Sequence, residues 1–173
     1  MFDALIEGED DEPNTDNINE LKISYINING LNNDKIKNTD MIKDMDNADI
    51  ICFSETHLKN ESDYPLIECY SGQHTTGKKS IKSGRNIKGI SVYIKDELKD
   101  LKIDKVISEK GTIIINRITQ KCEQLSDIYL LICYRSNKES KYKDKDFYEN
   151  IKDYIIKYKM ENILIIGDLN GRK

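Results

Sequence analysis

The stretch D-I-I-C-F-S-E-T-H-L, residues 49–58, decides how we interpret the fold of this chain. It begins with an unbroken apolar run from Ile50 to Phe53, which is typical of a short strand buried on both faces. Polarity then changes abruptly, and Glu55 stands where the strand ends. The ends of buried strands are common ligand-binding positions in α/β proteins. Because an unpaired carboxylate is costly at such a position, we interpret Glu55 as a metal ligand.

Three other strand-like stretches, residues 21–28, 127–134 and 163–166, also finish in polar residues. The residues at or just beyond these ends are Asn27, Asn29, Tyr134, Arg135, Asp168 and Asn170. Taken alone, the ends at Asn27 and Tyr134 are better explained by turn or capping chemistry. Four buried strands that end in the same residue types predict instead that these groups converge at one edge.

Hydrophobic patterning predicts a mixed order of strands and helices. Strands are expected at 21–28, 50–53, 87–94, 112–119, 127–134 and 163–166, with a short one at 106–107. A helix is expected over 34–47, which makes a crossover unit with the strands around it. The clearest helix covers 144–159, with Asp144 as its N-cap and an apolar stripe formed by Phe147, Ile151, Tyr154, Ile155 and Tyr158. Residues 59–86 read as polar and loop-rich, and the middle strands as an antiparallel meander.

Charge is distributed unevenly along the chain. Residues 1–20 contain eight acidic residues and no lysine or arginine, so they read as a disordered acidic leader. Without them the net charge changes from −4 to +4, which allows a polyanionic partner. Five cations occur without an intervening acid, and either phosphate binding or a solvated loop explains them equally well. These are Lys78, Lys79, Lys82, Arg85 and Lys88.

The four cysteines are scattered, and Cys52 and Cys133 fall inside apolar runs, so we expect reduced, buried thiols. No secretory signal and no membrane-length apolar run is visible, so we expect an intracellular protein, nuclear or cytoplasmic, that is not secreted.

Several motifs together resemble the endonuclease/exonuclease/phosphatase superfamily. They are N-I-N-G-L (27–31), S-E-T-H-L (54–58), K-G-I-S-V-Y-I (88–94), the Tyr134 strand and I-I-G-D-L-N-G-R (165–172). The forms at 54–58 and 167–172 look most like the apurinic-type endonuclease domain of non-LTR, LINE-like retrotransposons. The resemblance covers residues 21–173. It implies an α/β (α+β) four-layer sandwich of two mixed β-sheets flanked by helices, and metal-dependent nicking of DNA.

The same resemblance implies roles for individual residues. Glu55 resembles the Mg²⁺ ligand, with Mn²⁺ as an alternative ion, and Asn27 the amide that supports metal and phosphate. Tyr134 resembles the tyrosine that hydrogen-bonds the phosphate, and Asp168 the carboxylate that orients or deprotonates the attacking water. Asn170 resembles the amide that stabilises the transition state. Asn29 and Arg135 are expected at the substrate, as are the five cations above, and His57 receives no firm role.

Members of this superfamily continue past the G-D-L-N motif with strands that carry a terminal Asp-His pair, which these 173 residues do not contain. We therefore expect a domain that is incomplete at its C-terminus and impaired in cleavage. Two alternatives stay open: a catalytically dead nucleic-acid-binding remnant, and a phosphatase or phosphodiesterase acting on a phosphoester outside nucleic acids.

Overall fold

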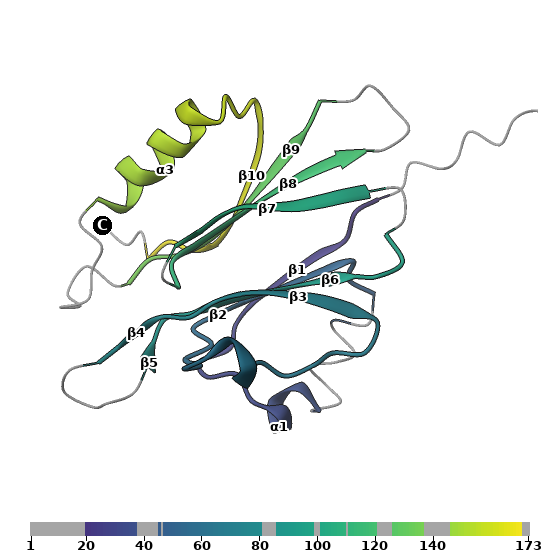
Figure 1. Ribbon diagram of the computed structural model, residues 1–173, viewed down its shortest axis with the longest axis vertical. Coiled ribbons are helices and arrows are strands. Elements are labelled where there is room, and N and C mark those ends of the chain that lie inside the picture. Colours follow the sequence, from purple (N-terminus) through teal and green to yellow (C-terminus); the bar gives the residue numbers. More distant parts are fainter. Residues whose placement is uncertain are drawn as a thin grey trace, which may run out of the picture.

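Two four-stranded mixed sheets pack face to face, with a helix on the outer side of each (Figure 1). In this computed structural model the described residues are 20–37, 45, 47–80, 86–98, 101–109, 111–120, 126–136 and 146–170. The layered architecture expected from the sequence is confirmed. Residues 1–19 of the acidic leader expected over 1–20 lie outside the described residues, so the leader stays a prediction.

The first sheet is built around the strand that ends at Glu55. Its order is β1-β2-β6-β3, with β1 and β2 parallel and the other pairs antiparallel. The strands are β1 (Ile23–Asn27), β2 (Ile50–Ser54), β3 (Tyr70–Thr75) and β6 (Ile90–Lys95). Every residue of β2 is buried, as its continuous apolar run predicts for a central strand.

The second sheet repeats the pattern of one parallel pair followed by antiparallel pairs. Its order is β10-β9-β8-β7. The strands are β7 (Leu101–Glu109), β8 (Ile113–Gln120), β9 (Ile128–Tyr134) and β10 (Asn162–Asp168). A small hairpin of β4 (Lys78–Lys79) and β5 (Asn86–Ile87) projects at one end of the sandwich (Figure 1).

Alternate side chains of each sheet fill three apolar layers. The middle layer joins the sheets and includes Ile50, Val92, Ile114 and Leu130. The outer layers lie under α1 (Asn33–Ile36) and α3 (Phe147–Lys157). Period-two alternation explains why neighbours along one strand belong to different layers.

Helix α3 carries the predicted apolar stripe. Phe147 and Ile151 are buried, and the other three stripe residues pack partly buried against the same layer. The helix is shorter than expected, because Asp146 rather than Asp144 precedes its first turn, and residue 144 lies outside the described residues. Of the helix expected over 34–47, α1 and a helical Met45 are seen, and most of the remainder lies outside the described residues.

Two other expectations for the strands were wrong, and one strand is longer than expected. No strand was expected within the loop-rich residues 59–86, but they contain β3, β4 and a 3₁₀ turn over Glu61–Asp63. The strand expected at 106–107 is present as part of the nine-residue β7. Finally, β10 is not buried on both faces: it is an edge strand of its sheet, and Leu164 and Ile165 are 43% and 44% exposed.

Candidate active site

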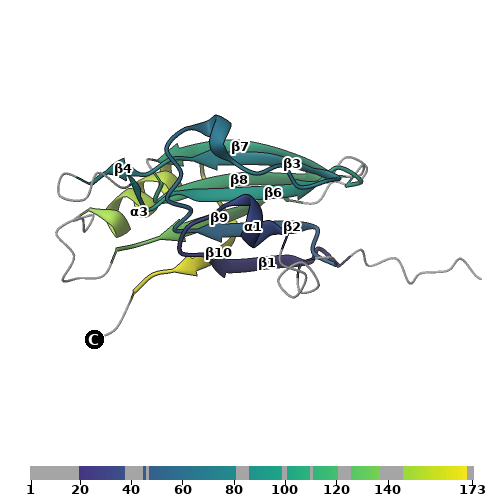
Figure 2. The same ribbon diagram turned by 90° about the horizontal axis from the view of Figure 1, so that it is seen from below.

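The carboxyl ends of four strands meet at one end of the sandwich. In the parallel pair β1–β2, Asn27 lies opposite Ser54, so Glu55 follows directly beyond the sheet. In the parallel pair β10–β9, Asp168 lies opposite Tyr134. Strands β1 and β10 run along the same side of the sandwich, which brings these two ends together (Figure 2).

Asn27 joins the two carboxylates. Its Nδ2 donates to Glu55 Oε1 at 3.2 Å and to Asp168 Oδ2 at 3.3 Å. One amide of the first sheet thus contacts an acid of each sheet, although Asn27 and Asp168 are 141 positions apart in the chain. The convergence of Glu55, Asn27 and Asp168 that the strand ends predicted is therefore present in the structure.

The segment that carries Glu55 has an unusual backbone. Glu55 and His57 have φ angles of +53° and +59°, in the left-handed region that residues other than glycine rarely adopt. Each such residue costs about 1 to 3 kcal/mol, and surrounding contacts must hold it. Here the Gly30 N–H donates to the Glu55 carbonyl at 2.7 Å, and the His57 N–H donates to the Lys88 carbonyl at 2.9 Å.

Glu55 is ionised over the whole neutral and mildly acidic range. Its pKa is lowered to about 2, mainly by a hydrogen bond with His57. Hydrogen bonds from Tyr134 and Asn27 lower the pKa further, and together these bonds outweigh burial, which raises it. His57 Nε2 lies 3.5 Å from Glu55 Oε2. The pKa of Tyr134 is raised, chiefly by burial and then by its bond to Glu55, so its hydroxyl stays a proton donor.

The turn after β10 is fixed against the end of β9. The Arg135 N–H donates to the Asp168 carbonyl at 2.9 Å, and Asn170 Nδ2 donates to the Arg135 carbonyl at 2.6 Å. The Asn170 N–H also donates to Asp168 Oδ1 at 3.1 Å. Asn170 adopts φ +43°, which asparagine tolerates better than most residues. These bonds hold Asp168 and Asn170 in one place.

The predicted substrate cations are placed less uniformly. Lys79 is exposed on the β4–β5 hairpin, whereas Lys88 is only 6% exposed, which weighs against direct phosphate contact from solvent. The backbone of Lys78 belongs to β4. Lys82 and Arg85 lie outside the described residues, so their role stays a prediction. Asn29, next to the Gly30 turn, is exposed at φ +44°, and its carbonyl accepts from Lys35 Nζ at 2.9 Å.

Two residues near the carboxylates were missed as site residues. The Tyr25 hydroxyl lies 2.6 Å from Ser54 Oγ, and the pKa of Tyr25 is raised by burial and by the charge of Asp168. Its position two residues before Asn27 on β1, and so on the same face, could have identified it. His57 was named without a role, and its contact with Glu55 depends on a left-handed backbone that the sequence does not indicate.

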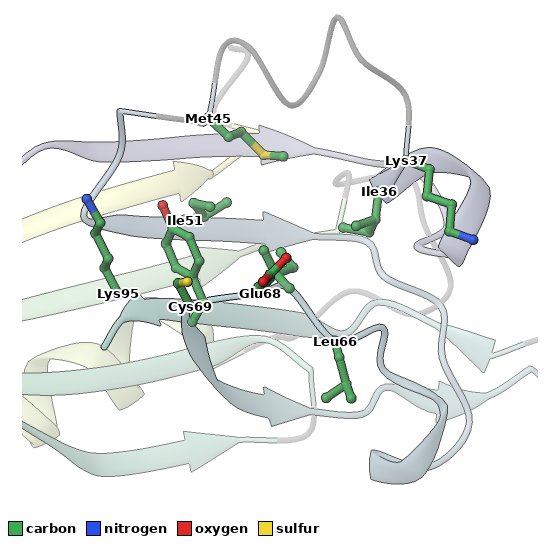
Figure 3. Close-up of a pocket in the computed structure, with 10 residues that line it drawn as sticks. Ile36, Lys37, Met45, Ile51, Leu66, Glu68, Cys69 and Lys95 are labelled. Atoms are coloured by element: carbon green, nitrogen blue, oxygen red, sulfur yellow. The ribbon is translucent and has the colours of Figure 1, made fainter. Parts of the chain in front are cut away.

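A separate pocket of about 550 Å³ lies between α1 and the outer face of the first sheet (Figure 3). Ile51 forms part of its wall, and Lys37, Cys69 and Lys95 also line it. None of the strand-end residues described above lines this pocket.

The donor set at the strand ends fits a hard divalent cation. Two carboxylates and an amide offer oxygen atoms, and Mg²⁺ is commonly held by only one or two carboxylates together with water and substrate phosphate. Among the described residues no three His, Cys, Asp or Glu side chains form a metal cluster, so such an ion would keep several waters. No helix in the described part of the chain is long and apolar enough to cross a membrane.

Comparison with solved structures shows which fold this is. The chain is similar to the Xenopus laevis APE2 catalytic domain, with a TM-score of 0.58 and 18% identity, over 86% of this chain and 58% of that one. It is also similar to an endonuclease/exonuclease/phosphatase family protein from Leptotrichia buccalis C-1013-b, with a TM-score of 0.52 and 17% identity, over 87% and 67% of the two chains. No protein-family model and no curated protein sequence matches. The chain thus spans little more than half the length of the APE2 domain.

Proposed function

Because the chain has the fold of the endonuclease/exonuclease/phosphatase proteins, we propose that it is a Mg²⁺-dependent DNA endonuclease that hydrolyses one phosphodiester bond and leaves a nick. Within that class, the motifs at 54–58 and 167–172 favour the apurinic-type endonucleases of non-LTR retrotransposons. The observation that carries the proposal is the sharing of the Asn27 amide by Glu55 and Asp168.

Repulsion between negative charges explains why a metal ion at this site would suit phosphodiester hydrolysis. A phosphodiester is anionic and repels both a hydroxide and the two site carboxylates, at roughly 4 kcal/mol for a unit-charge pair 4 Å apart at an effective dielectric of 20. A bound Mg²⁺ would offset these charges, orient the scissile phosphate and lower the pKa of a bound water. Glu55 would hold this ion, with Asn27 in support.

The other residues act on the substrate directly. Asp168, an acceptor fixed by the Asn170 N–H, orients the attacking water and takes up its proton. The Tyr134 hydroxyl and the Asn170 amide donate hydrogen bonds to the phosphate oxygens without adding charge. The basic hairpin, where Lys79 is exposed, lies at the same end of the sandwich and contacts the flanking DNA backbone (Figure 1).

Nicking of supercoiled plasmid by the purified chain tests the proposal. We expect slow nicking with Mg²⁺ or Mn²⁺, in keeping with the impaired cleavage expected from the sequence, loss of nicking in EDTA, and a large loss in the variants Glu55→Gln and Asp168→Asn. The matched control is Glu68→Gln, because Glu68 is exposed and lines the separate pocket. Nicking that survives Glu55→Gln would show that the site assignment is wrong.

Two other results would identify the alternatives. Salt-sensitive DNA binding by a protein that never cleaves would indicate a catalytically dead binding remnant. Hydrolysis of phosphoesters outside nucleic acids, with intact DNA, would indicate a phosphatase or phosphodiesterase on the same fold.

A further inference from the structure

An exposed aromatic side chain, Tyr148, contacts Arg135, the residue that directly follows Tyr134 of the candidate site. Tyr148, at the start of α3, is 49% exposed, whereas the next residue on its N-terminal side, Phe147, is 2% exposed and belongs to the core. The two rings meet edge to face, with centroids 5.4 Å apart and an interplanar angle of 81°. Phe147 thus anchors Tyr148 in a fixed orientation on the surface.

A guanidinium completes this surface. The Arg135 guanidinium carbon lies 4.6 Å from the centroid of the Tyr148 ring, and Arg135 Nη1 donates to the Tyr148 hydroxyl at 3.2 Å. The pair therefore combines a π-face with a planar cation, and its geometry is set by two separate contacts.

The pair is rigidly connected to the site. The backbone N–H of Arg135 donates to the Asp168 carbonyl, and its carbonyl accepts from the Asn170 side chain. Arg135 also directly follows Tyr134, whose hydroxyl hydrogen-bonds Glu55. A strand of DNA with its phosphate at the carboxylates would therefore place a neighbouring base within reach of this pair.

We propose that Arg135 and Tyr148 form a stacking platform for an unpaired base next to the phosphate held at the strand ends. Exposed aromatic rings and guanidinium planes are the usual partners of unstacked bases, and such stacking tolerates any base. The proposal rests on the proposed function, since it places the same DNA at the same site. It adds that the preferred DNA is single-stranded or locally unpaired there.

Binding without cleavage separates the two proposals, because it needs no nuclease activity. Fluorescence anisotropy in EDTA would compare a thymidine oligonucleotide of about 12 nucleotides with an all-abasic backbone of the same length. We expect Tyr148→Ala to weaken binding of the thymidine oligonucleotide about fivefold to tenfold and to leave the abasic backbone unchanged. Tyr148→Phe keeps the ring and should bind within about twofold of the unsubstituted chain.

Ile156→Ala is the matched control, because Ile156 is 65% exposed on the same helix and lies about 12 Å further along its axis. It should change neither affinity. The proposal is overturned if Tyr148→Ala has no effect, if it weakens both ligands equally, or if the unsubstituted chain binds neither. Loss of nicking in Glu55→Gln with this base dependence intact would support both proposals. Base-dependent binding by a chain that never nicks would contradict only the proposed function.

Discussion

Two glycines that flank the Glu55–His57 segment allow one prediction to be worked out in detail. Gly89 and Gly30 have φ angles of +104° and +95°, so alanine is strained at either position. A Cβ on Gly89 would lie 2.2 Å from Thr56 Oγ1, far inside contact distance. A Cβ on Gly30 would make only an ordinary van der Waals contact, with His57 Nδ1 at 3.9 Å. The pair therefore separates backbone strain from steric overlap.

The expected magnitudes follow from these two terms. Strain at a φ that favours glycine costs about 1 to 3 kcal/mol, and the lower entropy of the unfolded alanine chain offsets about 0.4 to 1 kcal/mol. Both substitutions share these terms. Overlap in a packed interior adds about 1 to 3 kcal/mol at Gly89 alone, because Thr56 is fully buried. Gly89→Ala should therefore lower the free energy of unfolding more than Gly30→Ala does, and the difference should be about 1 to 3 kcal/mol.

Urea unfolding followed by far-ultraviolet circular dichroism measures the difference. Thr56 Oγ1 has no hydrogen-bond partner among the described residues, so Thr56→Ala alone should be close to neutral. Added to Gly89→Ala, it should restore about 1 kcal/mol or more, because the next atoms, the His57 backbone nitrogen and Thr56 Cβ, lie at 3.4 Å and 3.5 Å. Equal destabilisation by the two alanines, or no recovery in the double variant, would refute this reasoning.

Three further predictions concern the rest of the chain. Lys159 lies just beyond α3 at φ +49°, a conformation that favours glycine. Lys159→Gly should therefore stabilise the protein by about 1 kcal/mol and raise its melting temperature by about 2 to 4 °C, and an unchanged melting temperature would contradict this. Burial lowers the pKa of His74 from 6.5 to about 4, so stability should fall as pH drops through that window. His74→Phe should flatten the fall by at most about 3 kcal/mol in urea titrations, and an unchanged fall would contradict this. In thiol labelling at pH 8, Cys69→Ser should remove one rapidly reacting thiol per chain, because Cys69 is exposed. Cys133→Ser should remove none, because Cys133 is buried and burial raises the pKa of its thiol to about 12.

Buried apolar runs allowed the sequence to predict the site better than its surroundings. Strands β2 and β9 are continuous hydrophobic segments, so their ends were clear, and Glu55 and Tyr134 followed directly from those ends. Asp168 and Asn27 could be grouped with them because parallel strands place their carboxyl ends at the same edge. The prediction depended on strand direction alone and needed no knowledge of side-chain contacts.

Features set by tertiary position could not be predicted in this way. Strand β3 was missed because it is an edge strand whose side chains are mostly polar, and Thr75 is its only buried residue. The burial of β10 was overestimated because sequence does not say which strand lies at an edge. The pairing of Arg135 with Tyr148 depends on where α3 begins and on how this helix packs against the sheet. The sequence around these two residues does not indicate that they meet.

Direct measurement of metal binding tests the central claim, that Glu55 holds one divalent cation at the strand ends, with the Asp168 carboxylate facing it. Electron paramagnetic resonance of Mn²⁺ titrated into the chain reports binding independently of cleavage. One site per chain is predicted. Its affinity should fall by at least about tenfold in Glu55→Gln, by less in Asp168→Asn, which removes only a nearby negative charge, and should not change in Glu68→Gln. Equal Mn²⁺ affinity in all four proteins would contradict the account.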